Sequence, residues 1–256
     1  MIDDRILLGF PVEFKDICKV YPPTVNDVSG NPHFKYFQSL FTITQEDLED
    51  AYMTSEIKQE ISICPTPFEY LMMNYYQDEQ MRKYILEGFE NFLHEPVTIE
   101  PEIKMLLIGI DEEHLDPNKD LDNPRLIKEE DYFDFQNLIR TVMGQELVAP
   151  PEPEDLDEDP RIKRYKAKVR ASEKLLKKKK SKSGPTFGTL LAAICCMGIG
   201  LTPLNIGEMS YACVHWLTAM EQQKEAYDID IRSLLAGADS KKIKPKYWIK
   251  NIDEEK

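Results

Sequence analysis

Apolar residues recur at helical spacing over most of the chain. Between Phe34 and about Leu93, steps of three and four residues place one apolar stripe on each predicted helix. Pro67 is a favourable first helical position within this region. A further stripe begins at Tyr132, and its helix is expected to end at Gly144. The pattern therefore predicts a mainly α fold.

Short runs of β-forming residues precede and interrupt these helices. Residues 6–8 and 12–20 predict short strands, the latter around a turn at Lys15 and Asp16. Residues 97–99 and 104–108 predict two more strands. The N-terminal part is therefore expected to be α+β, with a few short strands among several helices.

Polar residues mark the positions where helices are expected to begin. Thr24 and Thr44 each precede a helical stretch, and Thr44 has an acid three residues later. Asn205 and Glu208 show the spacing of a capping box near the C-terminus. A helix is therefore expected from about residue 206, and its apolar positions continue until Gly237.

An acidic, proline-rich stretch separates two parts of the chain. Residues 150–160 hold four prolines and almost no apolar residue, which is typical of a solvated linker. The sign of the charge then reverses, and the charged residues of 161–182 are all basic except Glu173. We expect an α+β domain over residues 1–147, the linker and a basic helix over 148–184, and an all-α helical domain, packed as a small bundle, over 185–256.

The net charge bears on partners rather than on the fold. A formal net charge of −14 repels nucleic acid and anionic membranes. The most apolar stretch, Phe187 to Leu201, is shorter than the roughly 20 residues that span a bilayer. The acidic N-terminus lacks the order of a signal peptide. We therefore expect a soluble cytoplasmic protein without a membrane partner.

Glycine and acidic motifs fall short of cofactor and calcium sites. Gly198 and Gly200 resemble the start of a dinucleotide loop, but Pro203 stands where the third glycine is needed. Within the acidic loop 111–123, residues 116–122 mimic the first ligands of a calcium loop, yet Leu121 holds the position that requires glycine. A turn between helices and a solvated acidic loop are the favoured interpretations.

One group of zinc-ligand residue types lies in the C-terminal part. It comprises Cys195, Cys196, Cys213 and His215, but adjacent cysteines on a helix point about 100° apart. Packing in the core is therefore favoured over metal binding. The five cysteines form no disulfide framework and are interpreted as reduced thiols. Without a recognisable catalytic motif, the sequence predicts a binding protein that is not an enzyme and has no cofactor or metal.

Two basic regions are candidates for binding. Residues 161–182 have the charge to bind nucleic acid, but a solvated helix or an intramolecular partner of the acidic linker is favoured. The C-terminal lysines and aromatics are the second region, where Trp248 either covers its own domain or anchors a partner. The candidate partner-binding residues are Trp216, Lys246, Tyr247 and Trp248.

Several stretches occur in an order that is familiar from phage proteins. On the C-terminal side they are residues 187–194 (FGTLLAAI), 200–210 (GLTPLNIGEMS), 215–217 (HWL), 234–237 (LLAG) and 246–249 (KYWI). Residues 20–28 and 132–139 fit the N-terminal side. Together they resemble the tail assembly chaperones of long-tailed, siphophage-like bacteriophages and prophages.

The resemblance implies a role and no catalytic residues. Members of that family coat the long tape-measure protein, help to recruit tail-tube subunits and are absent from the finished particle. The implied partners are the tape-measure and tail-tube proteins in the cytoplasm of the host bacterium, with self-association left open. Two alternatives stand beside it: a structural neck, tail or baseplate adaptor, and a nucleic-acid-binding regulator that uses residues 161–182.

Overall fold

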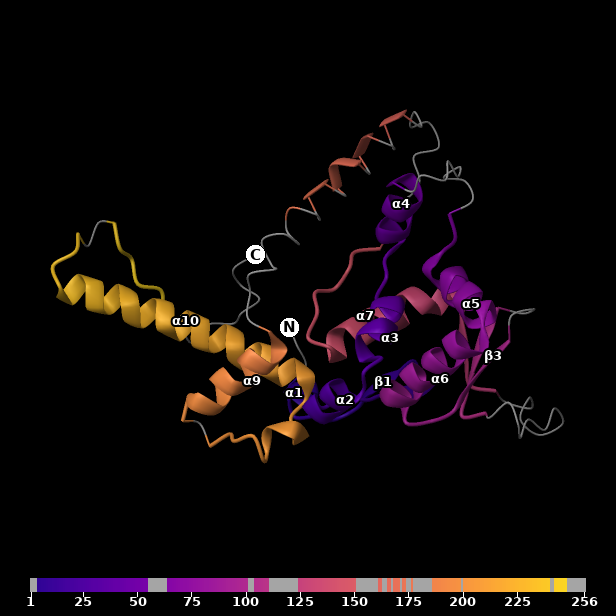
Figure 1. The fold of residues 1–256 in the computed structure, drawn as a ribbon, viewed down its shortest axis with the longest axis horizontal. Helices are drawn as coiled ribbons and strands as arrows, with labels where there is room; N and C mark the ends of the chain where they lie inside the picture. The colour runs from indigo at the N-terminus through magenta and orange to yellow at the C-terminus, as the bar shows by residue number, and fades with distance from the viewer. Residues whose placement is uncertain are drawn as a thin grey trace.

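The computed structural model is mainly helical, with two small antiparallel sheets (Figure 1). It describes residues 4–54, 64–100, 104–110, 124–150, 186–198, 200–239 and 242–247, together with residues 161–162, 165–166, 168–170, 172–173 and 176. The mainly α fold is confirmed. The acidic loop at 111–123, the linker residues 151–160 and Trp248 lie outside the described residues.

The helices of the N-terminal part, apart from α1, lie where the sequence predicted helices. They are α1 (Asp4–Leu7), α2 (Val25–Gly30), α3 (Phe34–Phe41), α4 (Gln45–Thr54), α5 (Pro67–Gln77), α6 (Glu79–Leu93) and α7 (Glu129–Val142). The C-terminal part holds α9 (Phe187–Cys196), the short 3-10 helix η3 (Ile206–Glu208) and α10 (Tyr211–Leu235). The described residues between 161 and 176 are also helical.

Side-chain caps fix the starts of several helices. The Thr24 and Thr66 side chains each accept a hydrogen bond from the backbone N–H three residues later. The carboxylate of the acid at that later position accepts a hydrogen bond from the threonine's own backbone N–H. Thr44 makes the same exchange with Asp47 at the start of α4. The helix starts predicted at Thr24, Thr44 and Pro67 are confirmed, because all of them depend on contacts within one helical turn.

Aromatic side chains of α3 and α6 form the centre of the main core. Phe37, Phe41, Phe89 and Phe92 are all at most 1% exposed. The Phe41 and Phe89 ring centroids lie 4.6 Å apart. Gly88 permits this close approach, since a Cβ atom there would lie 2.6 Å from the Phe41 ring. The two helices therefore meet across a position that only glycine fits.

The N-terminal hairpin matches its prediction. β1 (Val12–Phe14) pairs with β2 (Cys18–Val20) in antiparallel register. Lys15 and Asp16 form the turn with φ values of 46° and 58°. Two consecutive left-handed residues give the twist that a tight hairpin needs.

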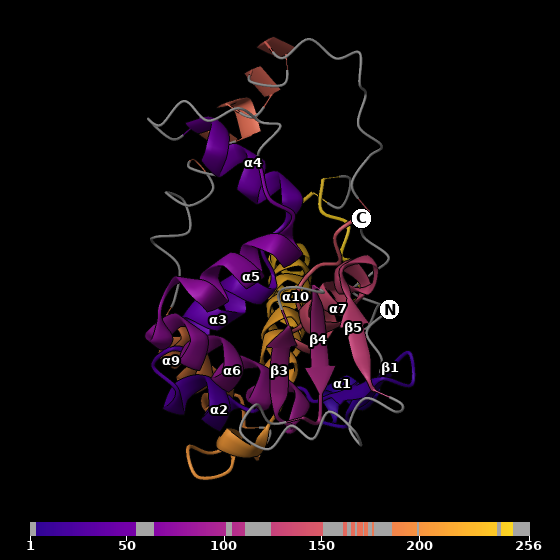
Figure 2. The same ribbon diagram turned by 90° about the vertical axis from the view of Figure 1, so that its right-hand side faces the viewer.

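A second sheet closes the end of the molecule opposite the outer half of α10 (Figure 2). β3 (Val97–Glu100) pairs with β4 (Met105–Ile108), which pairs with β5 (Leu126–Lys128), both antiparallel. The first two strands were predicted. The third was missed because it has only three residues and leads directly into α7, so no alternation marks it.

The prediction of a strand at residues 6–8 is wrong. Residues 4–7 form α1, a single helical turn. Ile6 is 1% exposed whereas Leu8 is 73% exposed, so only one side chain of the apolar run enters the core. One turn of helix buries that side chain and satisfies its own backbone, which an unpaired strand cannot do.

The helix expected from residue 206 begins five residues later. Asn205 does not cap it, because its side-chain oxygen accepts a hydrogen bond from the Thr202 N–H at 2.7 Å. Residues 206–208 form only η3. The true cap is Ser210, whose hydroxyl accepts a hydrogen bond from the Cys213 N–H. The asparagine therefore closes the preceding turn instead of opening a helix.

The C-terminal helices pack on the N-terminal ones. Ile194 of α9, Ile206 of η3 and Val214 of α10 share a buried cluster with Val25 of α2. Ala212 of α10 belongs to the main core. An N-terminal surface thus contributes to the packing of the C-terminal helices, and the division into three domains stays a prediction.

Candidate functional site

Backbone hydrogen bonds fix the base of α10 to the N-terminal part. The Tyr211 N–H donates to the Pro23 carbonyl at 2.8 Å, and the Val25 N–H donates to the Met209 carbonyl at 2.9 Å. The buried Ser210 hydroxyl donates to the last carbonyl of α1 at 3.1 Å. These bonds set the direction in which the helix leaves the body of the protein.

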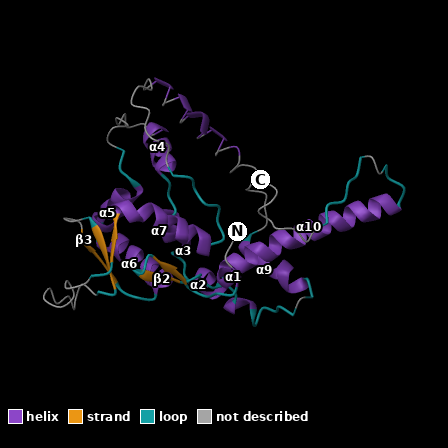
Figure 3. Ribbon diagram, turned by 180° about the vertical axis from the view of Figure 1, so that it is seen from behind, coloured by secondary structure: helices purple, strands orange, loops and turns teal. Residues whose placement is uncertain are grey.

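Beyond this base, α10 projects from the rest of the molecule (Figures 1 and 3). Its buried residues, Ala212 and Val214, both lie in the first turn. Apolar residues farther along are partly or largely exposed, and Ile229 and Leu235 are 55% and 83% exposed. A helix that presents apolar side chains away from its own core is typical of a protein-binding surface.

The structure separates the predicted partner-binding residues. Trp216 is half-buried near the base of α10. Lys246 and Tyr247 are exposed in the segment after the helix, where the Tyr247 ring meets Tyr227 at a centroid distance of 5.8 Å. Tyr227 lies about 16 Å beyond Trp216 along the helix axis. The tryptophan and the tail therefore belong to different ends of α10, and Trp248 is outside the described residues.

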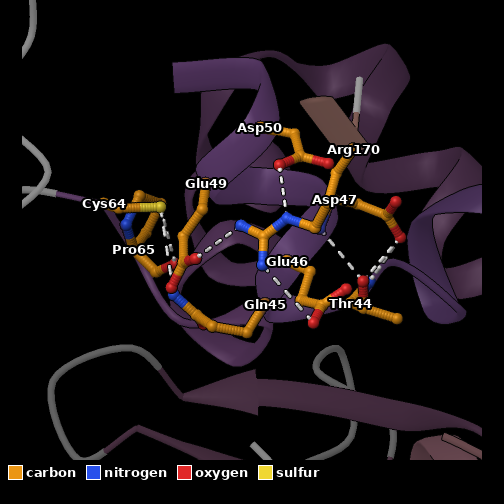
Figure 4. A network of polar contacts seen from close by, with 9 residues as sticks. All are labelled: Thr44, Gln45, Glu46, Asp47, Glu49, Asp50, Cys64, Pro65 and Arg170. Carbon is orange, nitrogen blue, oxygen red and sulfur yellow. Dashed lines mark hydrogen bonds and ion pairs between the residues drawn. The ribbon is translucent and has the colours of Figure 1, made fainter. Parts of the chain in front are cut away.

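An arrangement that the sequence did not reveal joins the basic segment to α4 (Figure 4). The Arg170 Nε atom lies 3.2 Å from an Asp50 carboxylate oxygen. Its two terminal nitrogens each lie 3.5 Å from a carboxylate oxygen, one of Glu46 and one of Glu49. The three acids are spaced so that they share one face of α4. One guanidinium thus spans an acidic helix face, and it does so beside an Asp50 side chain that is only 8% exposed.

This contact bears on the interpretations of the basic segment. The segment was expected to be a solvated helix or a partner of the acidic linker, rather than a nucleic-acid site. Arg170 pairs with α4, while linker residues 151–160 lie outside the described residues. Because carboxylates of α4 surround this guanidinium, a phosphate would have to displace them, which disfavours a nucleic-acid site centred on Arg170.

A cavity of about 460 Å³ lies at the starts of α4 and α5, beside one face of α7. Residues 148–150 form one wall, and the Asn137 side chain holds them in place. Its amide donates to the Val148 carbonyl and accepts from the Val148 N–H, both at 3.1 Å. The buried Tyr132 hydroxyl has no hydrogen-bond partner in the described part of the chain. No sequence signal marks this cavity, because its walls come from segments far apart along the chain.

Burial controls the titration of several side chains. It raises the pKa of Cys18 to about 12 and that of Cys64 to about 11. It also lowers the pKa of His215, whose ring meets Tyr211 edge-on at 4.5 Å. Because their pKa values are raised, the Cys18 and Cys64 thiols stay protonated near neutral pH and are poor nucleophiles there.

The zinc-ligand residue types of the C-terminal part lie on α9 and α10. Cys195 and Cys213 are half-buried, Cys196 is exposed, and all five cysteines are free thiols. Among the described residues, no three metal-ligating side chains of the His, Cys, Asp or Glu type gather at one place. Over the same residues, no helix combines the length and apolar character needed to cross a membrane.

Comparison with known proteins places the C-terminal part in a phage context. The family model for the second domain of YomV matches residues 177–253, a range that includes α9, η3 and α10. Neither the search of curated proteins nor the search of solved structures found a match. YomV is the name of a Bacillus phage-like protein, so the match indicates that the chain is phage-related.

Proposed function

We propose that the chain is a non-catalytic phage tail assembly chaperone. It binds the tape-measure protein in the host cytoplasm and helps to recruit tail-tube subunits. The main support for the proposal is that two observations fall on the same region. The phage-related match covers residues 177–253, and these residues include α10, which projects from the body with exposed apolar side chains. The same region carries most of the residues that resemble tail assembly chaperones.

The physical properties of the chain suit this role. A tape-measure protein is long, helical and apolar, so a protein that keeps it soluble needs apolar helical surface and a high net charge. The chain carries a net charge of −14 and presents Ile229 and Leu235 on α10. The hydrogen-bonded base of α10 orders this surface before a partner arrives, which reduces the entropy lost on binding.

The proposed partner surface combines the outer half of α10 with the tail segment. Tyr247 lies against Tyr227, and both Lys246 and Tyr247 are exposed. Aromatic side chains that keep an exposed edge are common anchors at protein interfaces. Trp216, half-buried at the base, has a supporting role in this proposal.

Co-expression with the tape-measure protein of the same phage tests the proposal. We expect a soluble complex on size-exclusion chromatography, with several copies of the chain per partner by mass analysis. The double variant Ile229→Asp, Leu235→Asp should leave the tape-measure protein insoluble, because charges then interrupt the apolar surface. Gln222→Asp, on another exposed position of the same helix, is the matched control and should retain the complex. Absence of a complex with the unaltered chain would contradict the proposal.

A further inference from the structure

A second apolar stripe on α10 has the spacing of a coiled-coil seam. It consists of Leu217, Met220, Lys224, Tyr227, Ile231 and Leu234. These residues follow one another at alternating steps of three and four, and all are half-buried. Such spacing is typical of a helix that packs along another helix, with one polar residue tolerated in the seam. We refer to these residues as the α10 seam.

The charges beside the α10 seam limit what can pack on it. Glu221 and Asp228 flank the seam on one side, and Gln223 and Asp230 flank it on the other. Glu221 also forms an ion pair with Lys224 of the seam at 3.6 Å. Two α10 helices packed together would therefore bring like charges into proximity. A helix with basic flanks would instead be attracted at both edges.

The basic segment of the same chain has this chemistry. Its apolar residues Ile162, Tyr165, Val169 and Leu176 are helical and are 50%, 70%, 40% and 60% exposed. They too fit alternating steps of three and four, with Ser172 at the intervening position. Three exposed cations, Arg161, Lys166 and Lys168, flank the first part of this stripe, and one exposed acid, Glu173, flanks its second part. We refer to these apolar residues as the basic-helix stripe.

The basic-helix stripe lies beside the face that Arg170 attaches to α4. Arg170 lies next to Val169 in sequence, about 100° around the helix, and its guanidinium is directed at the acidic face of α4 (Figure 4). The helix is thus attached to the body through one face while the neighbouring apolar face stays exposed. An exposed amphipathic face of this kind usually has a partner.

The structure already shows one basic segment against the α10 seam. Residues 242–247 include three lysines, and Tyr247 packs edge-on against Tyr227 of the seam. Tyr247 is nonetheless 55% exposed, so it covers the seam only partly. This contact places a segment with three lysines and an aromatic residue beside Tyr227 of the seam.

We propose that the basic-helix stripe of one copy packs along the α10 seam of a second copy, where it displaces Tyr247 from Tyr227. The two surfaces differ, so every copy offers one of each and the contact is heterologous. The opposite charges of the flanks favour this pairing over one between two α10 helices. It requires no phage partner and is therefore independent of the proposed chaperone role.

Charge reversal in the full-length chain tests the proposal. We expect the unaltered chain to self-associate with rising concentration in analytical ultracentrifugation, and to dissociate as salt is raised. Variant one carries Glu221→Lys, Asp228→Lys and Asp230→Lys; variant two carries Arg161→Glu, Lys166→Glu and Lys168→Glu. Each alone should self-associate at least about tenfold more weakly, because the flanks then repel. Circular dichroism establishes that both variants are folded.

Mixing the two variants separates pairing from general charge effects. In an equimolar mixture the flanks are again opposite in sign, so association should return to near that of the unaltered chain. Glu225→Lys, on an exposed position outside the seam, should have no effect. Tyr247→Ala should strengthen association, because it removes the competing contact. A chain that stays monomeric at every concentration, or variants whose mixture does not associate, would overturn the proposal.

Discussion

At the scale of single residues, Gln136 ties α7 to the end of α3. It is 5% exposed, and its side-chain amide donates to the Phe41 carbonyl at 3.0 Å and to the Ile43 carbonyl at 3.1 Å. Gln136→Leu leaves both carbonyls without this donor and should lower the free energy of unfolding by about 2 kcal/mol. Urea titration measures this change. Gln222→Leu, exposed on α10, should change it by less than about 0.5 kcal/mol, and equal effects of the two variants would contradict the assignment.

Cys18 gives the stability a dependence on alkaline pH. Burial raises the pKa of its thiol from 9.0 to about 12, so the folded state keeps a proton that the unfolded state has lost. The contribution is fully present below pH 9 and is lost as the pH rises through the interval to about 12. Urea unfolding at stepped pH should therefore show a steeper loss for the unaltered chain than for Cys18→Ala. Parallel curves would contradict the burial of this thiol.

At the scale of elements, Ser210 both caps α10 and attaches it to α1. Its hydroxyl accepts from the Cys213 N–H and donates to the Leu7 carbonyl, and the residue is 3% exposed. Ser210→Ala should destabilise the first turn of α10 by about 1–2 kcal/mol, measured as faster amide hydrogen exchange there. Thr186→Ala removes a comparable cap from an exposed position on α9 and should have the smaller effect. Unchanged exchange in α10 after Ser210→Ala would argue against this attachment.

Arg170 connects two elements that are far apart in sequence. Arg170→Met keeps most of the side-chain stem but leaves the Asp50 carboxylate, 8% exposed, without its guanidinium. Because Arg170 is itself 33% exposed, solvent screening limits the expected loss to about 1 kcal/mol. Hydrogen exchange of α4 amides should accelerate in this variant and stay unchanged in Lys168→Met. Identical behaviour of the two variants would show that the α4 contact is not formed.

Contacts within one helical turn could be predicted from the sequence, whereas contacts between distant segments could not. The starts of α2, α4 and α5 were predictable because Thr24, Thr44 and Pro67 act within one helical turn. The pairing of β5 and the contact of Arg170 with Asp50 were not, because their partners are set by the folded chain. The cavity wall at Val148 depends on Asn137 in the same way. The partner-binding role of Trp216, Lys246 and Tyr247 stays a prediction, and the distance between Trp216 and the tail segment could not be predicted because the folded chain sets it.

At the scale of the whole molecule, the chain has a compact aromatic core at one end and a projecting helix at the other (Figure 1). The core and its sheet provide a rigid support, while α10 and the basic segment present apolar and charged surface. Heterologous contacts between copies form open chains unless their rotation closes a ring. An open chain of copies would suit a coat on a long helical protein. The inferred self-association covers the α10 seam, whereas Ile229 lies on the opposite face of the helix and stays available to the tape-measure protein. Each proposal can still fail without the other.

A tail assembly chaperone acts during assembly and then leaves, and we propose that this chain does so. Quantitative mass spectrometry of purified particles and of the lysate from the same infection, with the phage that encodes the chain, tests it most directly. We expect an abundant protein in the lysate, recovered together with the tape-measure protein, and only background levels in the particles. A fixed copy number per purified particle would contradict the proposal and would identify the chain as a structural adaptor of the neck, tail or baseplate.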